Sequence, residues 1–194
     1  MNISGDSACD LDKVLLSLGI KVPVSFLNQL HSGIVNYIEE PGAYEGDALF
    51  TTSRNNTLVV RTADCLPIFF EDANTKTIGI IHMGWRSAKR KILNGIRGDL
   101  YNTKLAAGVG LRKCCYEVKG DFLKIPEFLS CIEEKDKKLY FDPISFVKTT
   151  LQAQGLDNNS LLDIGICSFC NKKNFYSYRR NKTNSRTLSF ILRI

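Results

Sequence analysis

Four short apolar runs between residues 47 and 82 constrain the fold more than any other feature of this sequence. They read DALFTT (47–52), TLVVRT (57–62), LPIFF (66–70) and TIGIIH (77–82). Each run is rich in β-branched and aromatic side chains, and short polar breaks separate it from the next, a pattern typical of β-strands. We therefore expect four neighbouring strands in one sheet, with His82 closing the last of them.

Helical and strand patterns are intermixed along the rest of the chain. We expect helices from Asp10 to Gly19, over residues 87–101, and from Pro143 to Gly155. Further strand patterns cover residues 22–30, 33–38, 105–111, 161–167 and 187–194. No repeat, low-complexity segment or linker divides the chain, so we expect a single-domain α/β layered sandwich with a mixed β-sheet over residues 1–194.

The charge of the chain is unevenly distributed. The formal net charge is +6, and basic residues gather in residues 86–97 and 172–186. These runs fit either a solvated face or a site for phosphate-bearing ligands. No recognition motif accompanies the charge, which makes a nucleic-acid partner the less favoured interpretation. The longest apolar runs are too short to span a membrane, so we expect no membrane association.

Seven cysteines and no recognisable signal peptide favour reduced thiols and a cytoplasmic location. Cys167 and Cys170 form a C-x-x-C motif, but we find neither a second cysteine pair of that kind nor a thioredoxin context. The adjacent Cys114 and Cys115 cannot easily form a disulfide with each other. We therefore expect the cysteines other than Cys65 to be reduced, dispensable for turnover and uninvolved in metal binding.

The only two histidines of the chain, His31 and His82, fall at expected strand ends or in the adjoining loops. Together with Cys65 they are suited to hold a catalytic zinc ion, which takes three protein ligands from Cys and His and keeps one position open. The same Cys and His also suit nucleophilic thiol chemistry, and each fits a buried structural role. The residues alone leave these readings open.

Several blocks of the sequence resemble the laccase-domain family of purine nucleoside phosphorylases. They are QLHSG, GDALFTT, RTADCLPIFFED, IGIIHMGWRSAKRKIL, GVGLRKCCYEV and FYSYRRNKTNSR, in the order of that family from about residue 28 to residue 190. The resemblance implies that His31, Cys65 and His82 are catalytic and hold one zinc ion. It also implies phosphorolysis of adenosine, inosine or methylthioadenosine by inorganic phosphate, and hydrolytic deamination of adenosine. Compared with this family, the N-terminal region looks shortened.

Phosphorolysis requires cations that position phosphate. Arg86 is the leading candidate because it follows His82 by four residues, at an expected strand-to-helix turn. Arg61, Arg179 and Arg180 are further candidates, and Asp64 is expected either to orient a ligand or to cap a turn.

Three other functions fit less well. A polyphenol oxidase needs several copper centres, for which two histidines are too few, so copper is less favoured than zinc. A hydrolase using Cys65 and His82 would need no metal. The presence of His31, Cys65 and His82 together argues against a non-catalytic binding module on the same fold. The sequence does not predict the oligomeric state.

Overall fold

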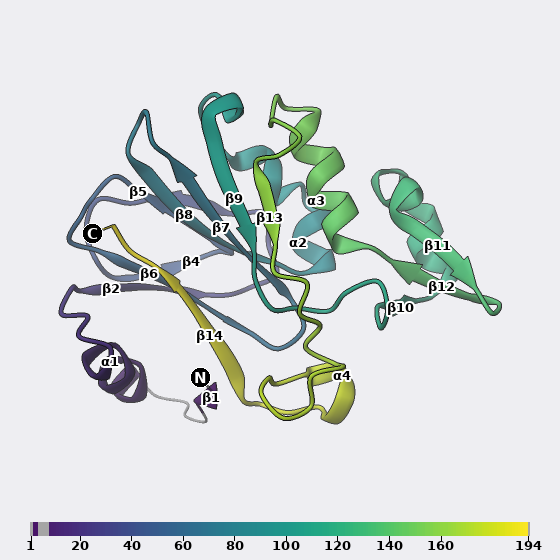
Figure 1. The fold of residues 1–194 in the computed structure, drawn as a ribbon, viewed down its shortest axis with the longest axis horizontal. Helices are drawn as coiled ribbons and strands as arrows, with labels where there is room; N and C mark the ends of the chain where they lie inside the picture. Colours follow the sequence, from purple (N-terminus) through teal and green to yellow (C-terminus); the bar gives the residue numbers. More distant parts are fainter. Residues whose placement is uncertain (1, 4–7, 194) are drawn as a thin grey trace.

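Two β-sheets lie face to face in the computed structural model, and helices α2 (Trp85–Lys89) and α3 (Pro143–Gln152) cover the outer face of the larger sheet (Figure 1). The structure describes residues 2–3 and 8–193. These three layers confirm the predicted α/β layered sandwich, except that the described residues form two mixed sheets where one was expected. Within the described part of the chain, no helix has the length and apolar character needed to cross a membrane.

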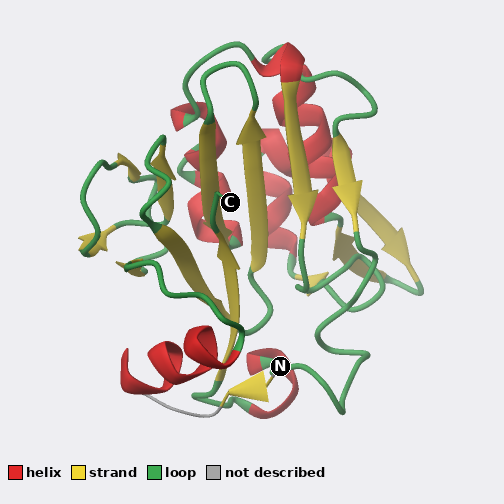
Figure 2. Ribbon diagram, turned by 60° about the vertical axis from the view of Figure 1, so that its left-hand side comes forward, coloured by secondary structure: helices red, strands yellow, loops and turns green. Residues whose placement is uncertain are grey.

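The larger sheet has six strands and lies in the middle of the molecule. Its strands, in order across the sheet, are β13 (Leu161–Asp163), β9 (Thr103–Ala107), β7 (Leu66–Asp72), β8 (Thr77–Met83), β5 (Ala48–Thr51) and β3 (Val35–Tyr37). The two outermost pairs are parallel and the inner pairs antiparallel. Figure 2 shows helices behind these strands. Because both faces are covered, the central strands are apolar on both sides.

The smaller sheet packs against the face opposite the helices. Its strands are β1 (Asn2–Ile3), β14 (Arg186–Ile191), β6 (Thr57–Thr62), β2 (Val24–Asn28) and β4 (Ala43–Glu45), in that order. Leu27 and Leu58 from this sheet meet Leu49 and Ile80 from the larger one in a buried cluster. The burial of these side chains holds the two sheets together.

The expectation of one sheet is wrong for one of the four apolar runs. β5, β7 and β8 share the larger sheet, whereas β6 belongs to the smaller one. The chain crosses between the sheets over residues 63–65, where Asp64 has a left-handed backbone conformation with φ of 91°. This crossing places Cys65 between the two sheets, at the end of both.

The helices agree with the sequence only in part. α3 begins after Asp142, whose side chain accepts hydrogen bonds from the N–H groups of Ile144 and Ser145. α1 (Ala8–Ser17) is present, but Asp10 lies inside it and not at its N-cap. The expected helix over residues 87–101 is wrong, since Lys91 adopts a left-handed conformation that ends α2. The chain continues in the 3-10 turns η1 (Ile92–Gly95) and η2 (Leu100–Asn102).

A third, small antiparallel sheet was not anticipated from the sequence. It contains β10 (Glu117–Val118), β12 (Lys138–Phe141) and β11 (Ile132–Lys135), and Figure 1 shows it projecting beside α3. The 3-10 turns η3 (Gly120–Lys124) and η4 (Pro126–Cys131) connect β10 to β11. Charged residues in the hairpin of β11 and β12 interrupt the apolar pattern by which a strand is recognised in a sequence.

Candidate functional site

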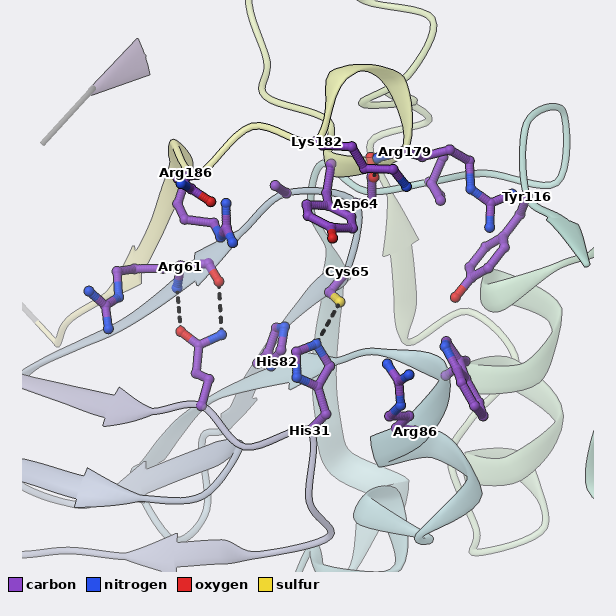
Figure 3. Close-up of a pocket in the computed structure, with 16 residues that line it drawn as sticks. His31, Arg61, Asp64, Cys65, His82, Arg86, Tyr116, Arg179, Lys182 and Arg186 are labelled. Atoms are coloured by element: carbon purple, nitrogen blue, oxygen red, sulfur yellow. Dashed lines mark hydrogen bonds between the residues drawn. The ribbon is translucent and has the colours of Figure 1, made fainter. Parts of the chain in front are cut away.

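The side chains of His31, Cys65 and His82 converge where the two sheets end (Figure 3). His31 lies in the loop after β2, Cys65 lies between β6 and β7, and His82 belongs to β8. The Sγ atom of Cys65 is 3.6 Å from Nε2 of His31. One potential ligand atom from each of the three residues lies within 4.8 Å of the others. We refer to these residues as the His–Cys–His cluster.

The backbone around this cluster is unusual in ways that leave space between the three side chains. His31 has a positive φ of 53°, a conformation that non-glycine residues seldom adopt. A Cβ atom on Gly84 would lie 3.0 Å from the Sγ atom of Cys65 and 3.0 Å from Cδ2 of His31. Glycine at position 84 therefore keeps a side chain out of the cluster.

Asp47 holds His82 by its imidazole ring and His31 by its backbone. Its carboxylate is buried and lies 2.7 Å from Nδ1 of His82, measured from Oδ1. It also accepts hydrogen bonds from the backbone N–H of His31 at 3.1 Å and from Ser32. With Nδ1 of His82 engaged, Nε2 is left to face Cys65 and His31. Histidines that bind metals are commonly held by a carboxylate in this way.

The electrostatics of the cluster favour a thiolate. Burial raises the pKa of Cys65, but the charge of His82 and hydrogen bonds from His31 and His82 outweigh it and lower the pKa to about 6. Burial lowers the pKa of His82, but the Cys65 thiolate and Asp47 raise it to about 9. For Asp47, hydrogen bonds from His82 and Ser32 outweigh burial and lower the pKa of the carboxyl. Cys65 is thus suited to act as an anionic ligand or nucleophile.

These donors fit a metal ion. Zinc binds thiolate sulfur and imidazole nitrogen, and three protein ligands leave a fourth position for a small molecule. The space kept by Gly84 and the orientation of His82 by Asp47 are both consistent with an ion among the three side chains.

The cluster forms the floor of a cavity of about 690 Å³. Four other predicted site residues line this cavity: Arg61, Asp64, Arg86 and Arg179. Figure 3 shows Arg86 on the side of α2 and Arg179 on the opposite rim. The structure does not bring Arg180 to the lining.

The arginines of the cavity differ in whether their guanidinium groups already donate hydrogen bonds within the protein. Arg179 donates to the carbonyl oxygens of Cys115 and Glu117. The guanidinium of Arg86 lies 4.6 Å from the centroid of the Trp85 ring and has no hydrogen-bond or ion-pair partner among the residues that the structure describes. The guanidinium of Arg86 is therefore available to bind an anion.

Arg180 and Asp64 hold the chain together near the cavity. The guanidinium of Arg180 donates to the backbone carbonyls of Ser168, Phe169 and Phe175. The carboxylate of Asp64 accepts hydrogen bonds from the Ser168 hydroxyl at 2.8 Å and from the backbone N–H of Arg179 at 2.6 Å. Asp64 thereby anchors the start of α4 (Tyr178–Asn181) over the cluster.

Several residues of the cavity were not singled out from the sequence. They are Gln29, Tyr116, Tyr178, Lys182, Asn184 and Arg186. Lys182 and Arg186 belong to the basic run 172–186, which the sequence offered as a possible site for phosphate-bearing ligands without assigning a role to either residue. Tyr116 reaches the cavity from the segment before β10, and no local pattern marks it.

Comparisons with known proteins identify relatives of this chain. Residues 9–194 match the model of the family described as multi-copper polyphenol oxidoreductase laccase. A protein of Borreliella burgdorferi named purine nucleoside phosphorylase is 34% identical over 187 residues, which cover 88% of this chain and 80% of that protein. A protein of the same name from Aquifex aeolicus is 33% identical over 153 residues, covering 76% of this chain and 71% of that protein.

Solved structures share the fold. The crystal structure of YlmD from Geobacillus stearothermophilus has a TM-score of 0.85 at 24% identity, covering 99% of this chain and 84% of that one. A Neisseria meningitidis protein assigned to the DUF152 family has a TM-score of 0.83 at 23% identity, covering 97% of this chain and 84% of that one. At these identities the likeness establishes the fold and not the reaction.

Proposed function

This chain belongs to the multi-copper polyphenol oxidoreductase laccase family, and we propose that it is a zinc-dependent purine nucleoside phosphorylase that also deaminates adenosine. Its substrates are adenosine, inosine or methylthioadenosine together with inorganic phosphate, and its location is the cytoplasm. One observation carries the proposal: the His–Cys–His cluster opens into a cavity whose rim is basic. The names of the relatives support the same reaction class.

In this proposal the His–Cys–His cluster holds the zinc ion. Zinc bound there supplies a Lewis acid and activates water near neutral pH. Asp47 keeps the Nε2 lone pair of His82 directed into the cluster by accepting the Nδ1 proton. Cys65 contributes the anionic ligand, which its lowered pKa favours.

The cavity has the size and the charges that a nucleoside and a phosphate require. Ligand pockets commonly measure about 300–1,000 Å³, and this cavity has about 690 Å³. Arg86 is the first candidate for phosphate, because its guanidinium donors are uncommitted within the described part of the chain, whereas the guanidinium of Arg61, although also uncommitted there, points away from the cluster (Figure 3). Arg61 and Arg179 are the next candidates in the lining. Asp64 acts by positioning Arg179 through its backbone N–H.

Two features of the chain weigh against oxidation of polyphenols despite the family description. Several copper centres need more imidazole ligands than two histidines supply. The cavity residues also include four arginines and a lysine, which suit an anionic substrate better than a neutral phenol.

One observation favours a second candidate, a cysteine-dependent hydrolase. Asp47, His82 and Cys65 form a connected series in which the carboxylate orients the imidazole and the imidazole stabilises the thiolate. Such a hydrolase would not need His31 as a ligand and would remain active without metal.

A combined metal and product measurement tests the proposal. The full-length protein, purified under metal-replete reducing conditions, is analysed for zinc and incubated with adenosine with and without phosphate. We expect adenine to form only with phosphate, and inosine to form in both incubations. Activity that persists after the metal is removed would favour the hydrolase instead. Absence of all purine products from a zinc-loaded protein would refute the phosphorylase.

A further inference from the structure

A second group of potential metal ligands lies outside the cavity. The Sγ atoms of Cys114, Cys115, Cys167 and Cys170 all lie within 4.8 Å of one another. The sulfur of Cys170 is 3.2 Å from that of Cys115 and 3.7 Å from that of Cys114. We call this group the four-cysteine cluster. The C-x-x-C motif seemed to have no second pair in the sequence, and the fold supplies one, the adjacent Cys114 and Cys115.

The fold brings these two pairs together independently of the thiols. β9 and β13 are parallel neighbours, so the segments that follow them leave the sheet at the same edge. Beyond the strands, Cys167 forms an isolated bridge with Gly110, and the N–H of Ser168 donates to the Gly110 carbonyl at 3.0 Å. An ion pair of 2.7 Å between Arg112 and Asp163 joins the same segments. The four sulfurs are thus held in place by the backbone.

The backbone fixes the shape of the C-x-x-C turn. The N–H of Asn171 donates to the carbonyl oxygen of Cys167 at 3.1 Å, and the N–H of Lys172 donates to that of Cys170 at 3.1 Å. The spacing of two residues between the cysteines is the one commonly found in structural zinc sites.

From this geometry we propose that the four-cysteine cluster binds a structural zinc ion, separate from the His–Cys–His cluster. A tetrahedral zinc ion with Zn–S bonds of about 2.3 Å separates its sulfurs by roughly 3.8 Å, close to the 3.7 Å between Cys114 and Cys170 and longer than the 3.2 Å between Cys115 and Cys170. Four thiolates fill all the positions of the ion and leave none for a substrate. Cys114 and Cys170 are exposed, which gives the ion a path of entry.

In this proposal the ion fixes the position of the C-x-x-C turn, which is joined by hydrogen bonds to residues at the cavity. Arg180 binds the carbonyls of Ser168 and Phe169 inside the C-x-x-C turn, and the Ser168 hydroxyl donates to Asp64. Asp64 in turn holds Arg179 and precedes Cys65 in the chain. The ion therefore supports the cavity through hydrogen bonds without contacting a substrate. This assignment does not depend on which reaction the cavity catalyses.

Metal content separates the two clusters. Full-length protein prepared with zinc under reducing conditions should contain two zinc ions per chain. Cys65→Ala should contain one, and the double variant Cys167→Ser, Cys170→Ser should also contain one. Cys131→Ala is the matched control, because Cys131 lies in neither cluster, and it should keep two. Unchanged zinc content in the double variant, or one ion in the wild type and none in Cys65→Ala, would overturn the assignment.

A second measurement does not require the double variant to fold. The Cys65→Ala protein is stripped of metal, kept reduced and titrated with Co²⁺. One equivalent should produce sulfur-to-cobalt charge-transfer bands and the intense visible bands of a tetrahedral thiolate site. Absence of these bands overturns the proposal, as does peptide mapping of protein isolated without added reductant that shows a Cys115–Cys170 disulfide in place of bound metal. Iron in place of zinc in the isolated protein would overturn the identity of the ion.

Discussion

The two clusters of potential metal ligands are built from different parts of the fold. The His–Cys–His cluster lies where strands end, with His82 buried and His31 and Cys65 half-buried, and it offers three ligands at the floor of a cavity. The four-cysteine cluster lies on loops, with two of its thiols exposed, and it offers four. An incomplete ligand set leaves a position for chemistry, whereas a complete set can only hold the chain together. The difference teaches that ligand number and surroundings together separate a reactive site from a structural one.

Removing the thiol of the His–Cys–His cluster should have the largest effect. Cys65→Ala should reduce both phosphorolysis and deamination by roughly a thousandfold, or about 4 kcal/mol, because both reactions depend on the Lewis acid held there. Adenine and inosine are measured separately, and zinc analysis should still find the ion of the four-cysteine cluster. Formation of either product at the wild-type rate would contradict the comparison, since the His–Cys–His cluster would then not be the reactive site.

Removing the guanidinium of Arg86 should have the next largest effect on activity. Arg86→Ala should reduce adenosine phosphorolysis by about 2 to 4 kcal/mol in transition-state free energy, because a charge-stabilising donor is lost. Deamination should be affected less, since water attack needs no phosphate, and zinc content should not change. The ratio of adenine to inosine released from adenosine measures the effect.

Lys89→Ala is the matched control for Arg86→Ala. Lys89 is an exposed cation on the same helix but does not line the cavity. It should leave the product ratio unchanged. Equal loss of both products in Arg86→Ala, with zinc retained, would give Arg86 a general role in the cavity and transfer the phosphate role to Arg61 or Arg179.

Replacing the carboxylate of Asp47, which holds His82, should have a smaller effect. Asp47→Asn should weaken zinc binding at the His–Cys–His cluster by about 10- to 100-fold, because the amide no longer fixes the protonated nitrogen of His82. Competition with a chromophoric chelator measures the affinity. Asp72→Asn is the control, since Asp72 is also buried and caps a turn, but its partners are Asn74 and Thr75. Equal weakening in both variants would mean that the effect is one of folding.

The fold could be predicted from the sequence wherever one periodicity dominates. The strands around Ile68 and Ile80 are apolar on both faces, and Asp142 with Pro143 marks the start of α3. The assignment of β6 to the second sheet could not be predicted, because it depends on the backbone of Asp64 and not on an apolar pattern. The end of α2 at Lys89, before the left-handed Lys91, was hidden by an amphipathic pattern that continues past it.

The candidate site, like the fold, could be predicted from the sequence only in part. A family resemblance singled out His31, Cys65 and His82, and the structure brings them together. The four-cysteine cluster was missed because its two pairs are far apart in the sequence, with a separation of 55 positions between Cys115 and Cys170, and only one pair has a metal-site spacing. Arg180 was assigned to the cavity by its charge, whereas its hydrogen bonds go to backbone carbonyls. Charge shows where a cation lies in the sequence and says nothing of which acceptors the fold places beside it.

The smallest expected effect concerns the thiols in metal-free protein and sharpens the contrast between the clusters. Burial opposes the thiolate of Cys65, but His82 and His31 lower its pKa to about 6. Burial and the neighbouring thiols instead raise the pKa of Cys114 to about 11. Alkylation by iodoacetamide requires the thiolate, so labelling of Cys65 should be constant at neutral pH and should fall as the pH drops through about 6. Cys114 should stay largely unlabelled between about pH 5 and 9.

The midpoint of the labelling profile is a better readout than the rate. A thiolate of low pKa is a weaker nucleophile, so at pH 7 the larger thiolate fraction of Cys65 should increase its rate only about two- to threefold over an ordinary thiol. Mass spectrometry of the peptide that contains Cys65 gives the midpoint. His82→Gln should move the midpoint upward, because the imidazolium that stabilises the thiolate is lost. A wild-type midpoint near the ordinary value of about 8.5 would mean that His82 does not stabilise a thiolate, and the electrostatic distinction between the two clusters would fail.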